Sequence, residues 1–406
     1  MDVSVATLVL VPLIAVAAPL IASLLGRVVK IPLVVFEIVL GLVLGPAVLG
    51  WAHSDDAVEL LAQFGLAMLF FLAGNEIDFA AVRGRPLKRA ALGWLISLVA
   101  GVSIGILFAP TIGAGVFIGV ALTSTALGTL MPVLRDAGEL HSPFGTAVLA
   151  VGAVGEFGPL LAISLFLSGR TPLHAALVLI GFAVIAGAGI LLAARGAGKR
   201  LHAIITVTLH TSGQFAVRLV MFVLLGLVAL SIALGLDMLL GAFAAGVLYR
   251  LLLSGAPEKD VVDVESKLEA VGYGFLVPIF FINTGLTFDL NALVTDARAL
   301  LLLPIFLLLL LVVRGLPSTL ATPSGSAWPD RSSMALLGAT GLPIIVAVTG
   351  IGVEEGDLTT GTAAALVGAG MLSVLLFPLI GLALHKRAPD AARQPGDGDP
   401  FIAEEG

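Results

Sequence analysis

The sequence predicts an all-α, polytopic membrane protein. Of its 406 residues, 59% are hydrophobic and only 12% are charged, whereas soluble domains are about 45–50% apolar and about 25% charged. Thirteen apolar stretches are long enough to cross a bilayer, which takes about 20 residues per helix. Lys and Arg are concentrated in every second connection between these stretches, as expected for the cytoplasmic loops of a multi-pass membrane protein.

The thirteen stretches follow one another with short connections, so no soluble domain is expected between them. They cover residues 4–26, 31–50, 58–76, 89–109, 113–134, 143–168, 173–194, 213–234, 236–254, 270–288, 298–316, 332–352 and 360–385. The polar tail, residues 386–406, is rich in Pro, Asp and Gly and is expected to be disordered.

The basic residues predict an orientation. Seventeen of the 21 Lys and Arg residues lie in the tail, in connections that follow odd-numbered stretches or near the adjoining stretch ends, and two lie in or beside connections that follow even-numbered stretches. Since Lys and Arg accumulate on the cytoplasmic side, we expect the N-terminus outside and the C-terminus in the cytoplasm, in a bacterial inner membrane. The other two, Arg218 and Arg314, lie within apolar stretches.

The chain also resembles itself. Leu69–Gly74, followed by Ile77–Phe79, matches Ile279–Gly285, followed by Phe288–Leu290, about 210 residues later. The helix count makes the two matching helices antiparallel, which is typical of the inverted repeats of secondary transporters. The expected organisation is one transmembrane domain, residues 1–385, with repeats over 4–168 and 213–385 and a linker helix over 173–194.

Glu156 is the strongest candidate for a functional residue. It lies in the middle of the sixth stretch, and no Asp, Glu, Lys or Arg accompanies it between His141 and Arg170. A charge at mid-membrane costs about 2.5–3.5 kcal/mol on insertion scales. A carboxylate placed there carries a proton, binds a cation or pairs with a base. A purely structural, permanently protonated or salt-bridged Glu is the alternative.

Three more charged residues within the apolar stretches stand out. Arg314 is the natural counter-charge for Glu156, although its position also suits snorkelling to the cytoplasmic face. Glu37 is an accessory candidate near a vestibule or a structural residue bonded to a neighbouring helix. Arg218 is interpreted as a snorkelling anchor.

Two stretches contain helix-weakening residues at matching places in the two halves. The fifth has Thr123, Ser124 and Thr125 before a Gly and a Pro, and the twelfth has Thr340 among glycines before Pro343. Interrupted helices at corresponding positions indicate a transporter binding site, and their hydroxyl and carbonyl oxygens suit a monovalent cation. The candidate ligands are Glu156, Thr123, Ser124, Thr125 and Thr340, with Asn283 as an accessory residue. Close helix packing by small residues is the alternative.

Several motifs are absent from the sequence. It contains no phosphate-binding Gly-rich loop ending in Lys-Ser or Lys-Thr, no Gly-x-Ser-x-Gly, no His-Glu-x-x-His and no Cys. We therefore expect neither ATP hydrolysis nor another enzyme activity, no cofactor, and no nucleic-acid partner.

Four segments resemble a known family. Ile31–Pro46, Leu69–Asp78, Met131–Asp136 and Pro278–Leu286 are similar, in order, to parts of the second, third, fifth and tenth helices of the monovalent cation:proton antiporter-2 family. The resemblance implies the sodium/proton antiporter fold with thirteen helices, two of them crossed and discontinuous. It also implies homodimers that work by elevator-like alternating access between two domains.

The resemblance also implies roles for site residues. Glu156 falls where the family has its ion-binding Asp, and Arg314 where a basic residue pairs with that Asp. Gly155 stands where other members have a second Asp or an Asn. With one carboxylate, electroneutral exchange of Na⁺ or K⁺ for a proton is the simpler expectation. A proton-coupled exporter of an organic solute and a non-transporting sensor or partner subunit stay open as alternatives.

Overall fold

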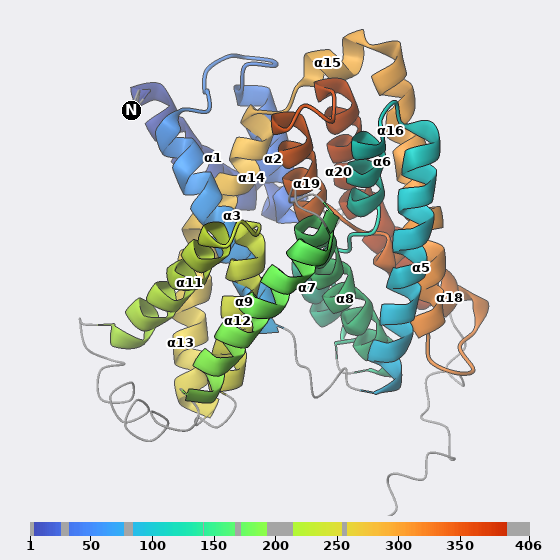
Figure 1. The fold of residues 1–406 in the computed structure, drawn as a ribbon. Coiled ribbons are helices and arrows are strands. Elements are labelled where there is room, and N and C mark those ends of the chain that lie inside the picture. The colour runs from blue at the N-terminus through green and yellow to red at the C-terminus, as the bar shows by residue number, and fades with distance from the viewer. Residues whose placement is uncertain are drawn as a thin grey trace, which may run out of the picture.

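The computed structural model describes residues 4–25, 32–76, 84–140, 142–166, 172–192, 214–253 and 258–387. All the regular structure in these ranges is helical, and every predicted stretch coincides with one helix or a pair of helices (Figure 1). Nine of the described helical segments are long and apolar enough to cross a membrane by themselves. The number of thirteen crossings therefore stays a prediction, and the tail beyond residue 387 lies outside the described residues.

The uninterrupted helices have the following bounds: α1 Val5–Leu25, α2 Leu33–Leu44, α3 Asp56–Glu76, α5 Arg85–Phe108, α8 Pro143–Phe166, α9 Pro172–Leu192, α11 Phe215–Ala233, α12 Met238–Leu253, α15 Leu290–Thr295 and α20 Thr360–His385. Two helices are broken, one into α6 (Ile112–Ala121) and α7 (Leu127–Ala137), the other into α18 (Trp328–Gly338) and α19 (Pro343–Glu354). These are the two stretches for which the sequence predicts interruption.

Two further helices contain a π-helical segment, in which an extra residue widens the helical turn. One joins α13 (Glu258–Val271) to α14 (Val277–Leu286) through Gly272–Leu276. The other joins α16 (Ala297–Leu309) to α17 (Leu316–Ser318) through Leu310–Gly315, before a 3₁₀ turn at Thr319–Ala321.

The tenth helix begins earlier than the sequence predicts, at Glu258 instead of residue 270. The extra segment, α13, is amphipathic. It buries Val264 and Leu268 and carries charged residues between them, so a search for continuous apolar sequence overlooks it.

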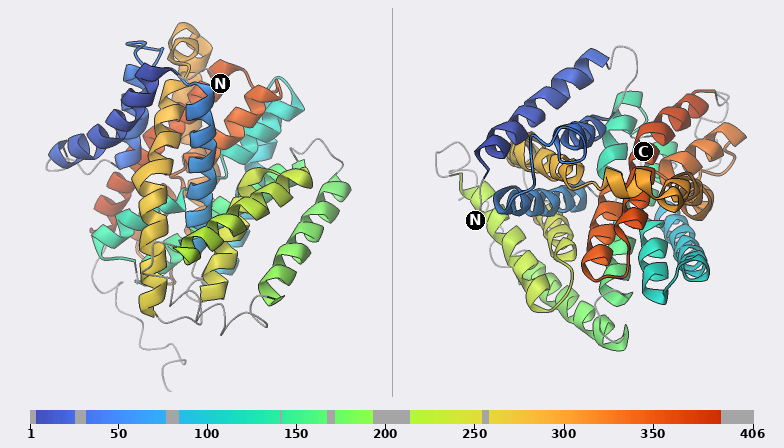
Figure 2. Two further views of the ribbon diagram at one scale, coloured as in Figure 1. Left: turned by 90° about the vertical axis from the view of Figure 1, so that its left-hand side faces the viewer. Right: turned by 90° about the horizontal axis from the view of Figure 1, so that it is seen from above.

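The helices form two groups. α1–α3 and α11–α14 pack together as a first group, called the scaffold group, and α5–α8 with α15–α20 pack together as the core group. The groups lie on opposite sides of the molecule in Figure 1 and, seen from above, in the right-hand view of Figure 2. α9 contacts α8 of the core group and both α11 and α12 of the scaffold group.

The scaffold group is held together by reciprocal glycine contacts. α3 packs on α12, and α14 packs on α2, so the third helix of each half meets the second helix of the other. A Cβ atom added at any of four glycines would meet the backbone of the facing helix: Gly74 at Phe243, Gly246 at Phe71, Gly41 at Ile282 and Gly285 at Ile38. Inverted repeats would give reciprocal contacts of this kind, and the repeats stay a prediction. The glycines let the two backbones of each pair approach closely.

Candidate functional site

The two broken helices cross at their breaks. In the segment between α6 and α7, the N–H of Ala126 donates to the carbonyl of Thr340 in the other break at 2.7 Å. The hydroxyl of Thr125 donates to the carbonyl of Gly338 at 2.6 Å, and the N–H of Thr125 donates to the carbonyl of Gly155 in α8 at 2.9 Å. A break leaves backbone groups unpaired in an apolar interior, so these mutual bonds stabilise the crossing.

The predicted hydroxyl ligands lie in this crossing and are buried. They donate to backbone carbonyls close to them in sequence: Thr123 to Val120 at 2.8 Å, Ser124 to Ala121 at 2.9 Å and Thr340 to Leu336 at 3.1 Å. Their hydrogens therefore bond to backbone carbonyls near the ends of α6 and α18. None of them, nor Thr125, lines the cavity that contains Glu156. Their role as cation ligands stays a prediction.

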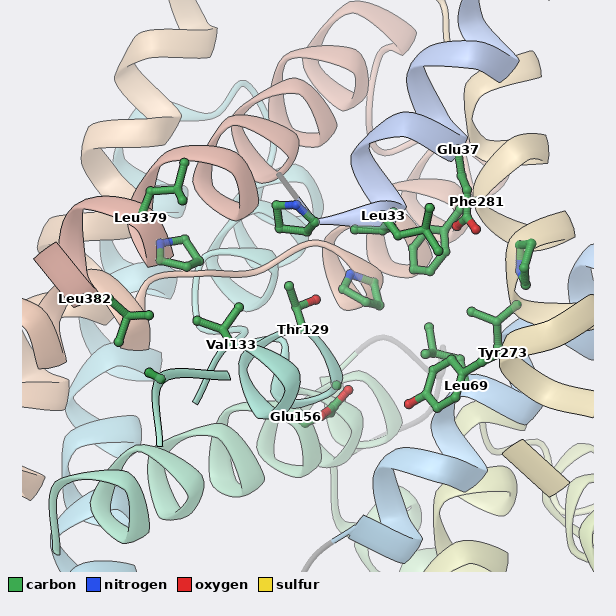
Figure 3. A pocket seen from close by; sticks show the side chains of 18 of the residues that line it. Leu33, Glu37, Leu69, Thr129, Val133, Glu156, Tyr273, Phe281, Leu379 and Leu382 are labelled. Atoms are coloured by element: carbon green, nitrogen blue, oxygen red, sulfur yellow. The ribbon is translucent and has the colours of Figure 1, made fainter. Parts of the chain in front are cut away.

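A cavity of about 480 Å³ lies between the scaffold group and the core group (Figure 3). α2, α3 and α14 line it from the scaffold side, and α7, α8 and α20 line it from the core side. Its lining extends from Glu156 to the exposed Lys386 after α20. The cavity therefore opens at the end of the molecule where α20 ends, which is the side predicted to be cytoplasmic.

Glu156 lies at the inner part of this cavity with 2% of its surface exposed. Its Oε2 accepts a hydrogen bond from the N–H of Leu127, the first residue of α7, at 3.2 Å. The unpaired N–H groups and the dipole at a helix N-terminus favour a negative charge. The break between α6 and α7 thus places the electropositive N-terminus of α7 against the carboxylate of Glu156.

Arg314 lies in the π-helical segment after α16 and is completely buried. Its Nε donates to the hydroxyl oxygen of Thr125 at 2.8 Å, and its Nη2 donates to the carbonyl of Val151 at 2.7 Å. Nη1 has no hydrogen-bond partner among the described residues. The described bonds of Arg314 therefore hold the helix crossing and α8 together, and its pairing with Glu156 stays a prediction.

Gly155 makes room for this arginine. A Cβ atom at Gly155 would lie 2.5 Å from Nη2 of Arg314 and 2.5 Å from the hydroxyl oxygen of Thr125. The space that a second carboxylate or amide would fill is thus occupied by the guanidinium group.

Tyr273, which was not among the predicted site residues, also lines this cavity, and it contacts a second such residue, Glu76. The hydroxyl of Tyr273 donates to Oε1 of Glu76, at the end of α3, at 3.1 Å, and it points toward Glu156 across the cavity (Figure 3). Oε2 of Glu76 is buried without a partner among the described residues.

The signals for these two residues were weak in the sequence. Glu76 ends an apolar stretch, where a charged residue is ordinary at a membrane surface. Tyr273 is one of only two tyrosines in the chain, but it faces the cavity from a π-helical segment that no periodicity reveals.

The accessory candidates lie apart from each other. Glu37 on α2 is 4% exposed and lines the scaffold side of the cavity. Asn283 on α14 does not line it, and its Oδ1 is buried without a described partner. The structure thus brings Glu37 and Glu156 to one cavity and leaves Asn283 outside it.

The sequence matches the transmembrane sodium/hydrogen exchanger family over residues 13–383, which is most of its length. The chain belongs to the sodium/hydrogen exchanger family. Proteins of similar sequence include the Bacillus cereus Na⁺/H⁺-K⁺ antiporter GerN, 25% identical over 86% of this chain and 88% of GerN. The provisionally named Na⁺/H⁺ antiporter YjbQ of Bacillus subtilis is 29% identical over 95% of this chain, which spans 64% of YjbQ.

A solved structure has the same fold. The sodium proton antiporter MjNhaP1 of Methanocaldococcus jannaschii superposes with a TM-score of 0.64 over 94% of this chain and 98% of that one, at 17% identity. The fold that the sequence predicts, an all-helical antiporter fold with two crossed broken helices, is confirmed.

Proposed function

We propose that this protein is a secondary transporter that exchanges a monovalent cation, Na⁺ or K⁺, for protons. The observation that carries the proposal is the burial of Glu156 at the N-terminus of α7, in a cavity between two helix groups. Family membership supports it, as do the antiporter names of the relatives.

A single buried carboxylate is sufficient for exchange. An ionised Glu156 without a partner is costly in an apolar interior, whereas a carboxylate that holds a proton or a cation is neutral as a unit. The core group can then move past the scaffold group when Glu156 is loaded with either ion, and it is held back when Glu156 is empty. One site that is loaded with either ion in turn gives one-for-one, electroneutral exchange.

The two helix groups support movement of the core group against the scaffold group. α7 and α8 carry Glu156 and its helix end on one side of the cavity, while Tyr273, which donates a hydrogen bond to Glu76, lines the other side. We further propose a homodimer in a bacterial inner membrane, with the N-terminus outside and the cavity open to the cytoplasm, as the basic residues predict.

The cavity favours a small cation over an organic solute. An exporter of organic solutes should have a wide cavity lined by Phe and Met. Here the described lining contains one Phe, Phe281, and no Met, and it contains the carboxylates of Glu37 and Glu156.

A pH-gradient assay tests the proposed function. In proteoliposomes with an imposed proton gradient, we expect Na⁺ or K⁺ to collapse the gradient, as reported by a pH-sensitive dye. Parallel measurements with Li⁺ and Rb⁺ determine which ionic radius the transporter prefers. The matched control is protein-free vesicles. If no alkali cation moves protons, the exporter or the non-transporting sensor is the better interpretation.

Replacing Tyr273 by Phe should raise the KM for the cation about tenfold and leave the maximal rate similar. The substitution removes the hydroxyl that positions Glu76, and a hydrogen bond to a charged group is worth about 1.5 kcal/mol or more. The control is Tyr249→Phe, because the Tyr249 hydroxyl is buried without a described partner. Equal KM values for the two variants would contradict a role of Tyr273 in the site.

A further inference from the structure

A second pocket, of about 310 Å³, lies at the end of the molecule where α5 begins, which is the lower end in Figure 1. Three parts of the core group meet around it: the start of α5 with Arg85 and Arg89, the start of α8 with Thr146, and the segment after the 3₁₀ turn with Ser324. All three lie in or beside connections that follow odd-numbered stretches, so the pocket is on the side predicted to be cytoplasmic.

This pocket is positively charged. Arg85 is exposed and Arg89 is half-buried, and they lie one helical turn apart on the same face of α5. Neither makes a hydrogen bond or an ion pair with another described residue, and none of the described lining residues is acidic. Glu139 before α8 and Asp330 on α18 instead lie against His385, at 3.2 Å and 2.7 Å.

The placement of the two arginines is unfavourable for α5 by itself. A helix N-terminus carries a partial positive charge, so basic residues there are destabilising, and like charges four residues apart repel each other. Neither α5 nor α8 has an acidic residue in its first turn to offset this. An anion in the pocket would offset both effects, because it would lie beside the two guanidinium groups and beside two helix N-termini.

The donors in the pocket suit a phosphate group. Guanidinium groups bind phosphate oxygens through paired N–H donors, and the hydroxyls of Thr146 and Ser324 supply two more. Neither hydroxyl takes part in a hydrogen bond with another described residue. A headgroup with an ammonium group would bring a further cation to the two arginines, so a phosphodiester with a net negative charge fits better than a zwitterion.

The surface around the pocket favours a lipid as the source of the phosphate. Leu92 follows Arg89 by one turn of α5 and is 54% exposed, and Leu320, next to the lining residue Ala321, is 43% exposed. Because the 3₁₀ turn packs on α5, these leucines extend an apolar surface from the edge of the pocket, where the acyl chains of a lipid can lie.

An exposed tryptophan indicates the depth of the pocket in the membrane. Trp328, the first residue of α18, is 79% exposed and follows the lining residue Ser324 by four positions. Trp side chains are enriched where a bilayer meets water. The pocket is therefore expected at the level of the lipid headgroups.

We propose that this pocket binds the phosphate of an anionic phospholipid from the membrane leaflet on its own side, with Arg85 and Arg89 holding the phosphate. The bound lipid connects the N-termini of α5 and α8 to the segment after the 3₁₀ turn, and it thereby stabilises the core group. The pocket shares no lining residue with the cavity that contains Glu156, so the inference does not rest on the proposed function.

Lipid binding to the purified protein in detergent tests the inference. Native mass spectrometry compares phosphatidylglycerol, which has a net negative charge, with phosphatidylethanolamine of the same acyl chains. We expect phosphatidylglycerol to bind about tenfold more tightly and to raise the melting temperature, because a ligand that binds the folded state stabilises it. Equal affinities for the two lipids would overturn the proposal.

A double substitution, Arg85→Gln with Arg89→Gln, should raise the Kd for phosphatidylglycerol by about tenfold for each arginine removed. The matched control is Arg331→Gln with Arg387→Gln, which makes the same change in net charge at exposed positions outside the pocket. The control should bind phosphatidylglycerol as the unsubstituted protein does. An equal loss in the two double variants would show general attraction to basic residues and would contradict a site in the pocket.

A third variant, Ser324→Trp, fills the pocket from an exposed position and leaves the charge unchanged. It should also weaken binding of phosphatidylglycerol, and it tests the pocket even if the arginine variants do not fold. Unchanged affinity in this variant would overturn the proposal. Inorganic phosphate distinguishes the two sources of the group: if it binds as tightly as phosphatidylglycerol, the ligand is a free phosphate and the lipid assignment is wrong.

Discussion

Replacement of Glu156 by Gln is expected to reduce cation-driven proton flux in proteoliposomes to the level of protein-free vesicles. Gln has nearly the same shape and can still accept the hydrogen bond that Leu127 donates, so the fold should persist. It cannot ionise, however, and cannot alternate between a proton and a cation. The flux is measured with a pH-sensitive dye inside the vesicles, and the melting temperature in detergent verifies the fold.

The matched control is Glu354→Gln. Glu354 ends α19 and is exposed, so the same chemical change there should leave the flux unchanged. Flux through Glu156→Gln at the unsubstituted rate would remove Glu156 from the mechanism.

Replacing Gly155 by Ala should nearly abolish exchange and should also lower the stability of the protein. The added methyl group would lie 2.5 Å from both Arg314 Nη2 and the Thr125 hydroxyl oxygen, and both groups are fixed by the helix crossing. Overpacking of this kind costs about 1–3 kcal/mol. Any relief of the contact must displace the arginine from the crossing.

The control for Gly155→Ala is Gly226→Ala in α11. A Cβ atom there meets nothing within 4 Å, so flux and melting temperature should stay close to those of the unsubstituted protein. Equal melting temperatures for the two variants would show that Gly155 does not have to be a glycine. A lower melting temperature for Gly155→Ala alone would show that Arg314 occupies the space that an acidic or amide side chain at this position would need.

Much of the fold could be predicted because lipid imposes simple rules on the sequence. Continuous apolar stretches predicted the positions of the helices. Gly, Pro and hydroxyl residues at matched positions predicted the breaks between α6 and α7 and between α18 and α19. α13 was not predicted because only one face of it is buried. The charged residues on its other face interrupt the apolar pattern, although the helix continues into α14.

The site was harder to predict than the fold. Glu156 could be found because a lone charge among apolar residues has few explanations. The hydroxyls of Thr123, Ser124 and Thr340 were plausible ligands by composition, but sequence does not reveal that local backbone carbonyls take their hydrogens. Glu76 and Tyr273 meet across 197 positions, and their encounter depends on a π-helical segment whose sequence resembles that of any other helix.

Four glycines allow α3 to pack closely on α12 and α14 to pack closely on α2. These contacts have a consequence for biosynthesis. α3 cannot bury its glycine face until α12 has been made, and α2 must wait for α14. During synthesis, the first half therefore enters the membrane with its close-packing surfaces covered only by lipid or by the insertion machinery. Final assembly of this part of the molecule must wait for translation to pass residue 286.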